Sequence, residues 1–531
     1  MFSRAEAVAA SIVSFMAAAI LVAYAFDAIG LTLHPFAILA IAVLAAGIII
    51  ACMRATAGNW FAFGAIVAGM LAWLMWLAWP HLLPLGRGTD LTHHLLLVDY
   101  IDRTGRLVHD RALEPYLGEM IDYTPGAHLL AVLAGRWTGR DGLHALYPVV
   151  ALSVGLKTGF VFLIALRCLP DSPPRIRLPL ATLAVVLLFL PRAYFLGSFA
   201  HDSYLAQVIG ELFAVAMWWA VVCWDQRESA VLAAFVAFAG CAAFLTWPVW
   251  TAPPLLTLLT LSALHRDRSM PSRLGHVAIA AVPIAVLAAV YAIGRVGTAT
   301  VMAGTSGAVL QLSLTNLNGI FVTVGAIGTV LAARDARGRS ASLLLAAIVL
   351  QAAALALVAR TPSAPYLALK MAYLAIYPLA VAGTFAIAVA LRSAKAVASI
   401  ALAVLFVIVA RGLATMPRPT PVISDPLLAA GRWAREHVPP HCVDYLVGND
   451  DTAYWLHLAV LGNPRSAPRS LATGTFEPQK AVERWILPGG LPYAIASDVD
   501  ALPRDIRTNV DVLAQFGAAA VVKRRDASAC P

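Results

Sequence analysis

Residues 60–107 read WFAFGAIVAGMLAWLMWLAWPHLLPLGRGTDLTHHLLLVDYIDRTGRL, and this stretch shows how the rest of the chain is built. About 20 mostly apolar residues come first, which is the length that spans a ~30 Å hydrocarbon core. A polar segment with acids, histidines and basic residues follows directly. The stretch therefore predicts a transmembrane helix that leads into a long loop at the membrane surface.

The composition of all 531 residues extends this prediction to the whole protein. Hydrophobic residues make up 60% of the chain and charged residues 13%, whereas average soluble domains carry about 25% charged residues. The few charges cannot cover a water-soluble globule of this size, which excludes a cytosolic enzyme. The net charge of +9 is then a sign of membrane topology and not of nucleic-acid binding.

Apolar blocks of similar length recur along the chain and predict a polytopic α-helical membrane protein with about thirteen transmembrane helices. The expected spans lie near 6–26, 35–53, 60–80, 146–167, 179–197, 205–224, 229–247, 249–264, 276–294, 316–333, 340–358, 370–391 and 396–413. The sequence contains no Walker loop, no strand–GxGxxG–helix motif and no HExxH motif.

The basic residues predict which side of the membrane each loop faces. With the N-terminus in the cytoplasm, the short outer loops hold only Arg295 and Arg360, with Lys370 at a span edge and Arg192 within the outer end of the fifth expected span. This skew is the positive-inside pattern and places the loop 81–145 and everything after 413 outside the cytoplasm. The inner loops and ends hold Arg4, Arg54, Arg167, Arg175, Arg177, Arg227, Arg266, Arg268, Arg273, Arg334, Arg337, Arg339, Arg392 and Lys395.

Asp90 is the first candidate functional residue of the outer loop. It stands just before an apolar run with helical spacing (Leu91, Leu95, Val98, Ile101). A carboxylate at the membrane surface can take a proton from an acceptor hydroxyl, and such general-base catalysis contributes about 10²–10⁴-fold. Alternatively, Asp90 caps the helix that starts at Leu91. The two roles are compatible, because a capping carboxylate can also face a cavity.

The histidines of the same loop have weaker signals. His93 and His94 are adjacent, so on a helix they point about 100° apart and at most one can join Asp90 as a metal ligand. We expect them to be surface histidines. Residues 123–128 (YTPGAH) predict a turn into an amphipathic or re-entrant helix over 129–135. His128 is then either a substrate contact or a simple interfacial residue.

A second outer loop, residues 191–204 (PRAYFLGSFAHDSY), gathers polar groups at the membrane surface. Arg192 is suited to a phosphate, because a guanidinium binds two oxygens at once. His201 and Asp202 stand close by. Asp202 is a second acid, a metal ligand or the cap of the helix that begins near Leu205.

Lys157 stands in the middle of the fourth expected span. A charge there costs about 2.5–3.5 kcal/mol, so an intramembrane lysine is a functional candidate by default. The alternative is a structural pair with a carboxylate, and the sequence offers no obvious partner at the same depth.

Lys370 stands at the outer edge of the twelfth span, one helical turn after Tyr366, so these two residues share a helix face. Lys370 and Arg192 are both placed to neutralise a departing lipid phosphate, and Arg360 is near enough in sequence to assist. Snorkelling of Lys370 to the interface explains its position without a function.

The tail 414–531 begins at a proline-rich entry and predicts a small α/β domain outside the membrane. We expect helices over 424–438, 450–461, 479–487 and 505–516, and strands over 442–447, 493–496 and 519–523. Cys442 and Cys530 lie near the ends of this tail, in a compartment that permits oxidation. They form either a disulfide or two free thiols.

The arrangement resembles the GT-C glycosyltransferases. The resemblance covers most of the chain in architecture, and in motif it rests on Gly88-Thr-Asp90 with His93/His94, on the TGRL run ending at Leu107, and on Tyr123–His128. One departure is that many GT-C members carry this loop directly after the first span, whereas two extra spans precede it here. The tail and loop also look similar to actinobacterial arabinofuranosyltransferases that use decaprenyl-phospho-arabinose.

The resemblance implies an inverting glycosyltransferase with a polyprenyl-phosphate sugar donor and an extracytoplasmic glycan, lipid or protein acceptor. By position, Asp90 would be the base, and Arg192 and Lys370 would stabilise the leaving phosphate. A divalent metal between Asp90 and Asp202 is compatible with this, although no ligand spacing specifies one. The implied location is a bacterial inner membrane, with residues 1–413 as the transmembrane module and 414–531 as the outer domain.

Three other functions compete with this one. A lipid-linked glycan polymerase or ligase needs the same face and the same phosphate-binding cations. A secondary transporter or flippase would use Lys157 as a coupling charge near the midplane, but it leaves the outer loop and the tail without a role. A scaffold for other membrane enzymes would need none of the outer polar residues.

Overall fold

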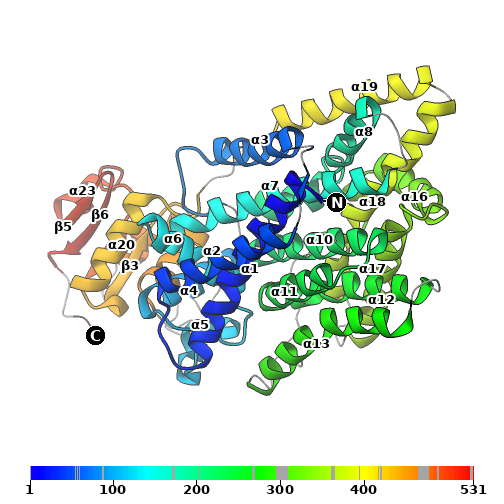
Figure 1. The fold of residues 1–531 in the computed structure, drawn as a ribbon. Coiled ribbons are helices and arrows are strands. Elements are labelled where there is room, and N and C mark those ends of the chain that lie inside the picture. The colour runs from blue at the N-terminus through cyan, green and yellow to red at the C-terminus, as the bar shows by residue number, and fades with distance from the viewer. Residues whose placement is uncertain are drawn as a thin grey trace.

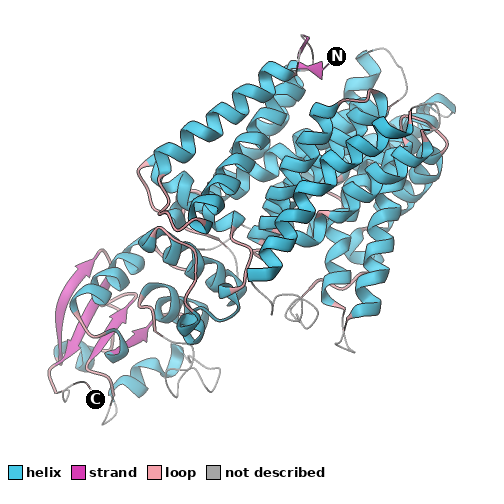
Figure 2. Cartoon of the chain, turned by 60° about the horizontal axis from the view of Figure 1, so that its bottom comes forward, coloured by secondary structure: helices cyan, strands magenta, loops and turns pink. Residues whose placement is uncertain are grey.

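The computed structural model describes residues 2–53, 55–56, 58, 60–85, 89–169, 174–200, 202–265, 269–294, 309–359, 365–393, 395–416, 418, 421–463, 478–486, 490–526 and 530. Within these residues the chain forms a large bundle of helices and one small β-sheet unit at its C-terminal end (Figures 1 and 2).

Each of the thirteen apolar segments expected to span the membrane lies on a helix. Among the described residues, eight of these helices are long and apolar enough to cross a membrane, and five are shorter. The helices of the bundle are α1 (Arg4–Ala28), α2 (Pro35–Cys52), α3 (Trp60–Ala78), α7 (Gly142–Cys168), α8 (Pro174–Leu187), α10 (Leu205–Gln226), α11 (Ala230–Thr246), α12 (Ala252–Leu264), α13 (Met270–Gly294), α16 (Gly319–Ala333), α17 (Arg339–Val358), α18 (Tyr366–Ser393) and α19 (Lys395–Ala414).

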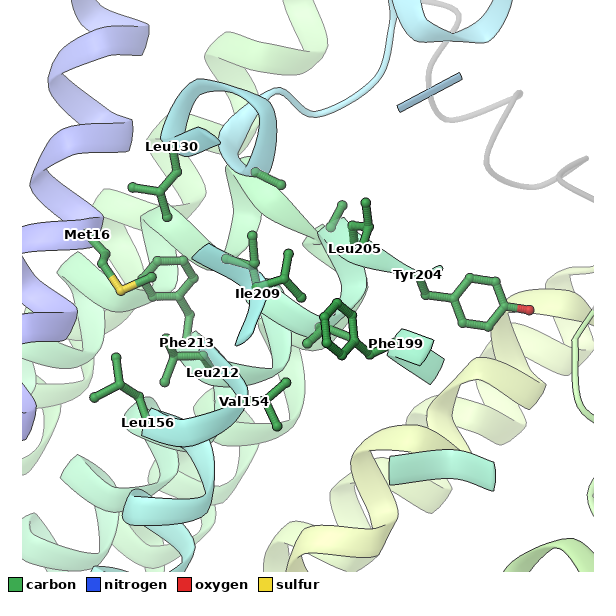
Figure 3. Packing of buried hydrophobic residues seen from close by; sticks show 14 of the residues in the cluster. Met16, Leu130, Val154, Leu156, Phe199, Tyr204, Leu205, Ile209, Leu212 and Phe213 are labelled. Carbon is green, nitrogen blue, oxygen red and sulfur yellow. The ribbon is translucent and has the colours of Figure 1, made fainter. Parts of the chain in front are cut away.

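The core of the bundle is formed around α10 and α7. The apolar window of α10 is completely buried and that of α7 is 89% buried, whereas the windows of α2 and α13 are only 11% and 17% buried. Ile209, Leu212 and Phe213 of α10 lie among Val154 and Leu156 of α7 in this core (Figure 3). The exposed apolar faces of α2 and α13 are the surfaces that a bilayer would cover.

Close helix contacts in the bundle depend on small residues. Gly328 of α16 lies against the backbone of Ala382 in α18, and a Cβ atom at position 328 would overlap the Ala382 carbonyl. Small residues let helix backbones approach in this way when hydrophobic burial alone cannot hold them together.

The loop after α3 forms its own short helices against one end of the bundle. They are α4 (Thr89–Thr104), the 3₁₀ turn η1 (Arg111–Leu113), α5 (Glu114–Leu117), the 3₁₀ turn η2 (Gly118–Ile121) and α6 (Gly126–Thr138). The side chains of Leu91, Leu95, Val98 and Ile101 are buried, as their helical spacing predicted. We call the end of the bundle that carries these elements the loop end.

The C-terminal unit contains helices and a four-stranded sheet. Its elements are α20 (Asp425–His437), the 3₁₀ turn η5 (Pro440–Cys442), β3 (Val443–Leu446), α21 (Asp450–Trp455), the π-helical turn η6 (Leu456–Val460), α22 (Pro478–Ile486), β4 (Tyr493–Ala496), α23 (Arg504–Thr508), β5 (Val510–Phe516) and β6 (Ala519–Arg524). The strand order is β3-β4-β6-β5, with β3 parallel to β4 and the other pairs antiparallel.

The expected helix over 505–516 is wrong. The structure has a short helix, α23, and then strand β5, which pairs with β6 around a tight turn at Gly517 with a φ of +61°. The alternation of Val510, Val512 and Ala514 is a strand signal that the expected helix overlooked. The other expected elements of the tail are present, and Cys442 and Cys530 form a disulfide with Cα atoms 5.8 Å apart.

The C-terminal unit contacts the loop through charged groups. Asp141 caps α7 and binds Arg432 of α20 at 2.8 Å, while His144 bridges Asp141 at 2.6 Å and Asp425 at 2.7 Å. Burial opposes ionisation of Asp141, but the hydrogen bonds from His144 and Arg432 outweigh it and hold the pKa of this carboxyl well below its usual range. The C-terminal unit is thus held against the loop end (Figure 1).

Candidate active site

Helix α4 places the candidate base near its N-terminus. The helix begins at Thr89, two residues earlier than expected, so Asp90 lies in the first turn and not at the cap position. The side chain of Asp90 lies outside the described part of the chain, as do residues 86–88. The role of Asp90 as a base therefore stays a prediction.

The expectation of a surface position for His94 is wrong, and His128, which was expected to be a substrate contact or an interfacial residue, lies beside it. Both side chains are buried, and His94 Nδ1 lies 3.0 Å from His128 Nε2 with the two rings stacked. Burial, with a smaller contribution from His94, holds the pKa of His128 well below its usual range. His128 is therefore neutral near pH 7, and the pair is a buried polar feature at the loop end.

The reason for this burial is that the segment before α6 packs against the end of α11. Tyr123 lies edge-on to both histidine rings, and the Thr124 hydroxyl donates to the Thr246 carbonyl at 3.0 Å. Gly126 lies so close to Thr246 that a Cβ atom would not fit. The neighbouring residue His93 points elsewhere, because it binds Glu119 at 2.6 Å and Tyr454 of the C-terminal unit at 3.2 Å.

Lys370 is fully buried near the start of α18, which disfavours the alternative that it snorkels to the interface. Its Nζ atom lies over the ring of Tyr204 and is 5.1 Å from the ring centre of Tyr366 and 5.4 Å from that of Tyr373. The predicted face shared by Tyr366 and Lys370 is therefore present. We call Lys370 with Tyr204, Tyr366 and Tyr373 the lysine–tyrosine site.

Sequence analysis missed two of these tyrosines. Tyr204 precedes α10, and its ring points away from the apolar core (Figure 3) towards Lys370 and Tyr373 of α18. Tyr366 and Tyr373 are seven residues apart, which places them on one helix face and is a signal that was present in the sequence. Ser203 beside Tyr204 has a φ of +56°, a strained conformation for serine of the kind found at functional sites.

The other residues of the second loop are only partly placed. Asp202 does not cap α10, because Tyr204 occupies the N-cap position. Arg192 is exposed, and its Nη1 atom donates to the Gly412 carbonyl of α19 at 3.3 Å. His201 and Arg360 lie outside the described residues. Contributions of Arg192, His201 and Arg360 to a phosphate site stay predictions.

Lys157 has the carboxylate partner that the sequence did not reveal. It pairs with Glu211 of α10, and both side chains are fully buried. Glu211 also accepts a hydrogen bond from Tyr377 of α18. The expectation that Lys157 has no carboxylate partner at its depth is therefore wrong. Helices α7 and α10 bring together two residues that are 54 positions apart in the sequence.

The metal considered between Asp90 and Asp202 stays a prediction, because the side chain of Asp90 lies outside the described residues. Within the described residues, the group with three metal-type ligands is His441, Cys442 and Cys530, and its two cysteines are joined in the disulfide.

Comparisons with known proteins give structural likenesses only. No family model matches the chain, and no curated protein matches its sequence. The structure is similar to an oligosaccharyltransferase from Archaeoglobus fulgidus in its apo form (TM-score 0.48, 13% identity, covering 83% of this chain and 70% of that one). It is also similar to that enzyme in complex with zinc and sulfate (TM-score 0.47, 14% identity, 82% and 68% covered).

A further likeness is to ArnT from Cupriavidus metallidurans in the apo state, with a TM-score of 0.49, 15% identity, and 87% and 97% of the two chains covered. Because each TM-score is below 0.5, these likenesses decide nothing about the reaction, which is argued below from the residues.

Proposed function

We propose that this protein is an inverting membrane glycosyltransferase that moves a sugar from a polyprenyl-phosphate donor to an acceptor hydroxyl at the loop end. The observation that carries the proposal is the lysine–tyrosine site: a fully buried lysine at the start of a membrane helix, surrounded by three tyrosines. Intramembrane ionisable residues usually mark functional sites.

The chemistry of this site fits a lipid phosphate. The Lys370 ammonium supplies positive charge in surroundings of low dielectric, where it stabilises a developing phosphate charge far more strongly than it would in water. Tyr204 and Tyr373 supply aromatic surface, and their hydroxyls can bind phosphate or sugar oxygens. The exposed apolar faces of the bundle would leave the polyprenyl tail in the bilayer.

In the proposed reaction Asp90 takes the proton of the acceptor hydroxyl, whose oxygen attacks the anomeric carbon. The bond from that carbon to the phosphate oxygen breaks on the opposite face, and polyprenyl phosphate leaves. Lys370 stabilises the phosphate charge, with Arg192 and Arg360 as further candidate cations. This geometry requires the sugar to lie between the start of α4 and the start of α18.

The finer assignment is arabinofuranosyl transfer from decaprenyl-phospho-arabinose to a glycan of the cell envelope. The skew of basic residues supports a bacterial inner-membrane location with a cytoplasmic N-terminus, which places the loop end and the C-terminal unit outside the cytoplasm. A lipid-bound donor suits that compartment, because nucleotide-activated sugars are scarce there.

The transporter hypothesis has one observation in its favour, the buried Lys157–Glu211 pair. A polymerase or ligase of lipid-linked glycans would share the phosphate site but would not need the Asp90 base.

A transfer assay separates these functions. Membranes that contain the wild type or Asp90→Asn receive radiolabelled decaprenyl-phosphate sugars, including the arabinofuranose donor, and label is followed into glycan, lipid and protein fractions. We expect transfer by the wild type and a loss of about 10²–10⁴-fold in Asp90→Asn with donor binding retained. Equal transfer by both would remove Asp90 as the base, and no transfer from any donor would favour the transporter.

A further inference from the structure

A second polar cluster lies inside the bundle, deeper than the lysine–tyrosine site. Glu211 of α10 is fully buried, and its Oε2 atom accepts hydrogen bonds from Lys157 of α7 and Tyr377 of α18. Its Oε1 atom accepts from Gln207 at 3.4 Å. One carboxylate thus joins three helices. We call Lys157, Glu211 and Tyr377 the Glu211 cluster.

The two sites occupy the same faces of the same two helices. Glu211 follows Tyr204 by seven residues, and Tyr377 follows Lys370 by seven residues. Seven residues are about two helical turns, or about 10.5 Å along the axis. Helices α10 and α18 therefore meet twice on these faces, first where Lys370 lies over Tyr204 and again where Tyr377 donates to Glu211.

We propose that the Glu211 cluster is a positioning device for the donor-phosphate site. It fixes the axial position and rotation of α18 against α10 and so holds Lys370 over Tyr204. The inference rests on the proposed role of Lys370, and it adds that Glu211 and Tyr377 set donor affinity without touching the donor.

The physical basis is the cost of leaving a buried carboxylate without its hydrogen bonds, which is high in low dielectric. A shift of α18 by one residue moves Tyr377 by about 1.5 Å along the axis and rotates it by about 100°, which breaks its bond to Glu211. Only one position of α18 against α10 therefore keeps the hydrogen bond from Tyr377 to Glu211.

The location of Tyr377 on α18 strengthens this role. Pro378 follows it inside the helix, and an internal proline removes one backbone hydrogen bond and lets a helix kink. The hydrogen bond from Tyr377 to Glu211 therefore holds α18 next to the proline that interrupts its backbone hydrogen bonding, between Lys370 and the rest of the helix.

The test compares two buried tyrosines in the full-length protein in nanodiscs. Tyr377→Phe removes the bond to Glu211 but keeps the Lys157–Glu211 pair, so the fold should survive. Tyr147→Phe is the matched control, because Tyr147 is also buried and donates one helix-to-helix bond, to the Leu74 carbonyl at 2.9 Å. Each variant is measured for decaprenyl phosphate binding, for KM and kcat of transfer, and for thermal midpoint.

We expect Tyr377→Phe to weaken decaprenyl phosphate binding and to raise the donor KM by about threefold to tenfold, while kcat stays near the wild-type value. Tyr147→Phe should change neither KM nor binding, although both variants lower the thermal midpoint to a similar extent. Equal KM and binding values for the two variants would overturn the positioning role.

Lys370→Ala separates failure of this inference from failure of the proposed function. If Lys370→Ala binds decaprenyl phosphate as well as the wild type, the phosphate site itself is misplaced, whatever Tyr377→Phe does. If Lys370→Ala loses binding while Tyr377→Phe matches Tyr147→Phe, the phosphate site stands and the Glu211 cluster is only structural.

Discussion

The two ends of the helical bundle use charged groups in different ways. At the end opposite the loop, acids and bases form ion pairs between helices: Glu6 with Arg167 at 2.5 Å, and Asp225 with Arg339 at 2.7 Å. The loop end also has ion pairs, such as Arg432 with Asp141 at 2.8 Å. In addition, Lys370 lies among tyrosine rings there, and His94 stacks on His128. The first pattern holds helices together, whereas the second gathers buried cationic, aromatic and imidazole groups, among them the lysine of the proposed phosphate site.

The largest effect should come from the lysine–tyrosine site. Lys370→Met keeps the length of the side chain and removes its charge. We expect transfer to fall by about 10²–10³-fold, because a positioned group that stabilises leaving-group charge is lost. The thermal midpoint should not fall, because removal of a buried charge lifts its desolvation cost. Initial rates at saturating donor and thermal unfolding in nanodiscs check both statements.

At the end of the bundle opposite the loop, a substitution should lower stability and leave transfer unchanged. Glu6 is nearly buried, caps α1 and binds Arg167 and the Trp219 indole. We expect Glu6→Ala to cost about 3 kcal/mol of stability, because it leaves Arg167 without its carboxylate in a largely buried position. Transfer per folded molecule should remain near the wild-type value. A loss of specific activity in protein that is still folded would contradict the division between the two ends.

The histidine pair should give the loop end a pH-dependent stability. The pKa of His128 is lower in the folded protein than in the unfolded chain, so below about pH 6.5 the unfolded state binds more protons. Stability should therefore be complete above about pH 6.5 and fall as the pH drops, by up to about 1.4 kcal/mol per pH unit. Thermal midpoints from pH 7.5 to 5 measure this.

Two variants sharpen the same test. His128→Asn should have a flatter stability profile over this range than the wild type. His437→Asn is the control, because His437 is exposed and stacks on Trp433 in the C-terminal unit. If both variants keep the wild-type slope, His128 is not the group that titrates.

The smallest effect should come from the ion pair between Asp225 and Arg339. Arg339 is a quarter exposed, and His265 also binds Asp225, at 2.6 Å. We therefore expect Arg339→Ala to cost only about 1 kcal/mol, since one partner of the carboxylate remains and the lost pair is partly screened. The thermal midpoint should fall slightly, and donor KM should stay unchanged.

Local patterns in the sequence were enough to predict most of the fold. Apolar blocks of membrane-spanning length predicted the helices of the bundle, and the cap at Ser424 marked the first helix of the C-terminal unit. Strand β5 was mistaken for a helix because apolar Leu513 interrupts the alternation of apolar and polar residues along it.

The candidate site was harder to predict, because its residues meet only through tertiary packing. Glu211 is an isolated acid in the apolar stretch of α10, far in sequence from Lys157, and nothing local links the two. Burial of His94 and His128 depends on how the segment before α6 fits against α11. In contrast, Lys370 and Tyr366 share a face of one helix, so spacing alone could relate them.

The most direct test of the central claim is to find where the donor phosphate binds. A radiolabelled decaprenyl phosphate with a photoreactive diazirine next to the phosphate is cross-linked to the full-length protein in nanodiscs, and the labelled peptides are sequenced. We expect label in residues 366–373 of α18 and 202–207 at the start of α10, with competition by unlabelled decaprenyl phosphate and loss of label in Lys370→Met. Competed label at the opposite end of the bundle, near Arg167 or Arg339, would contradict the claim that the loop end is the active end.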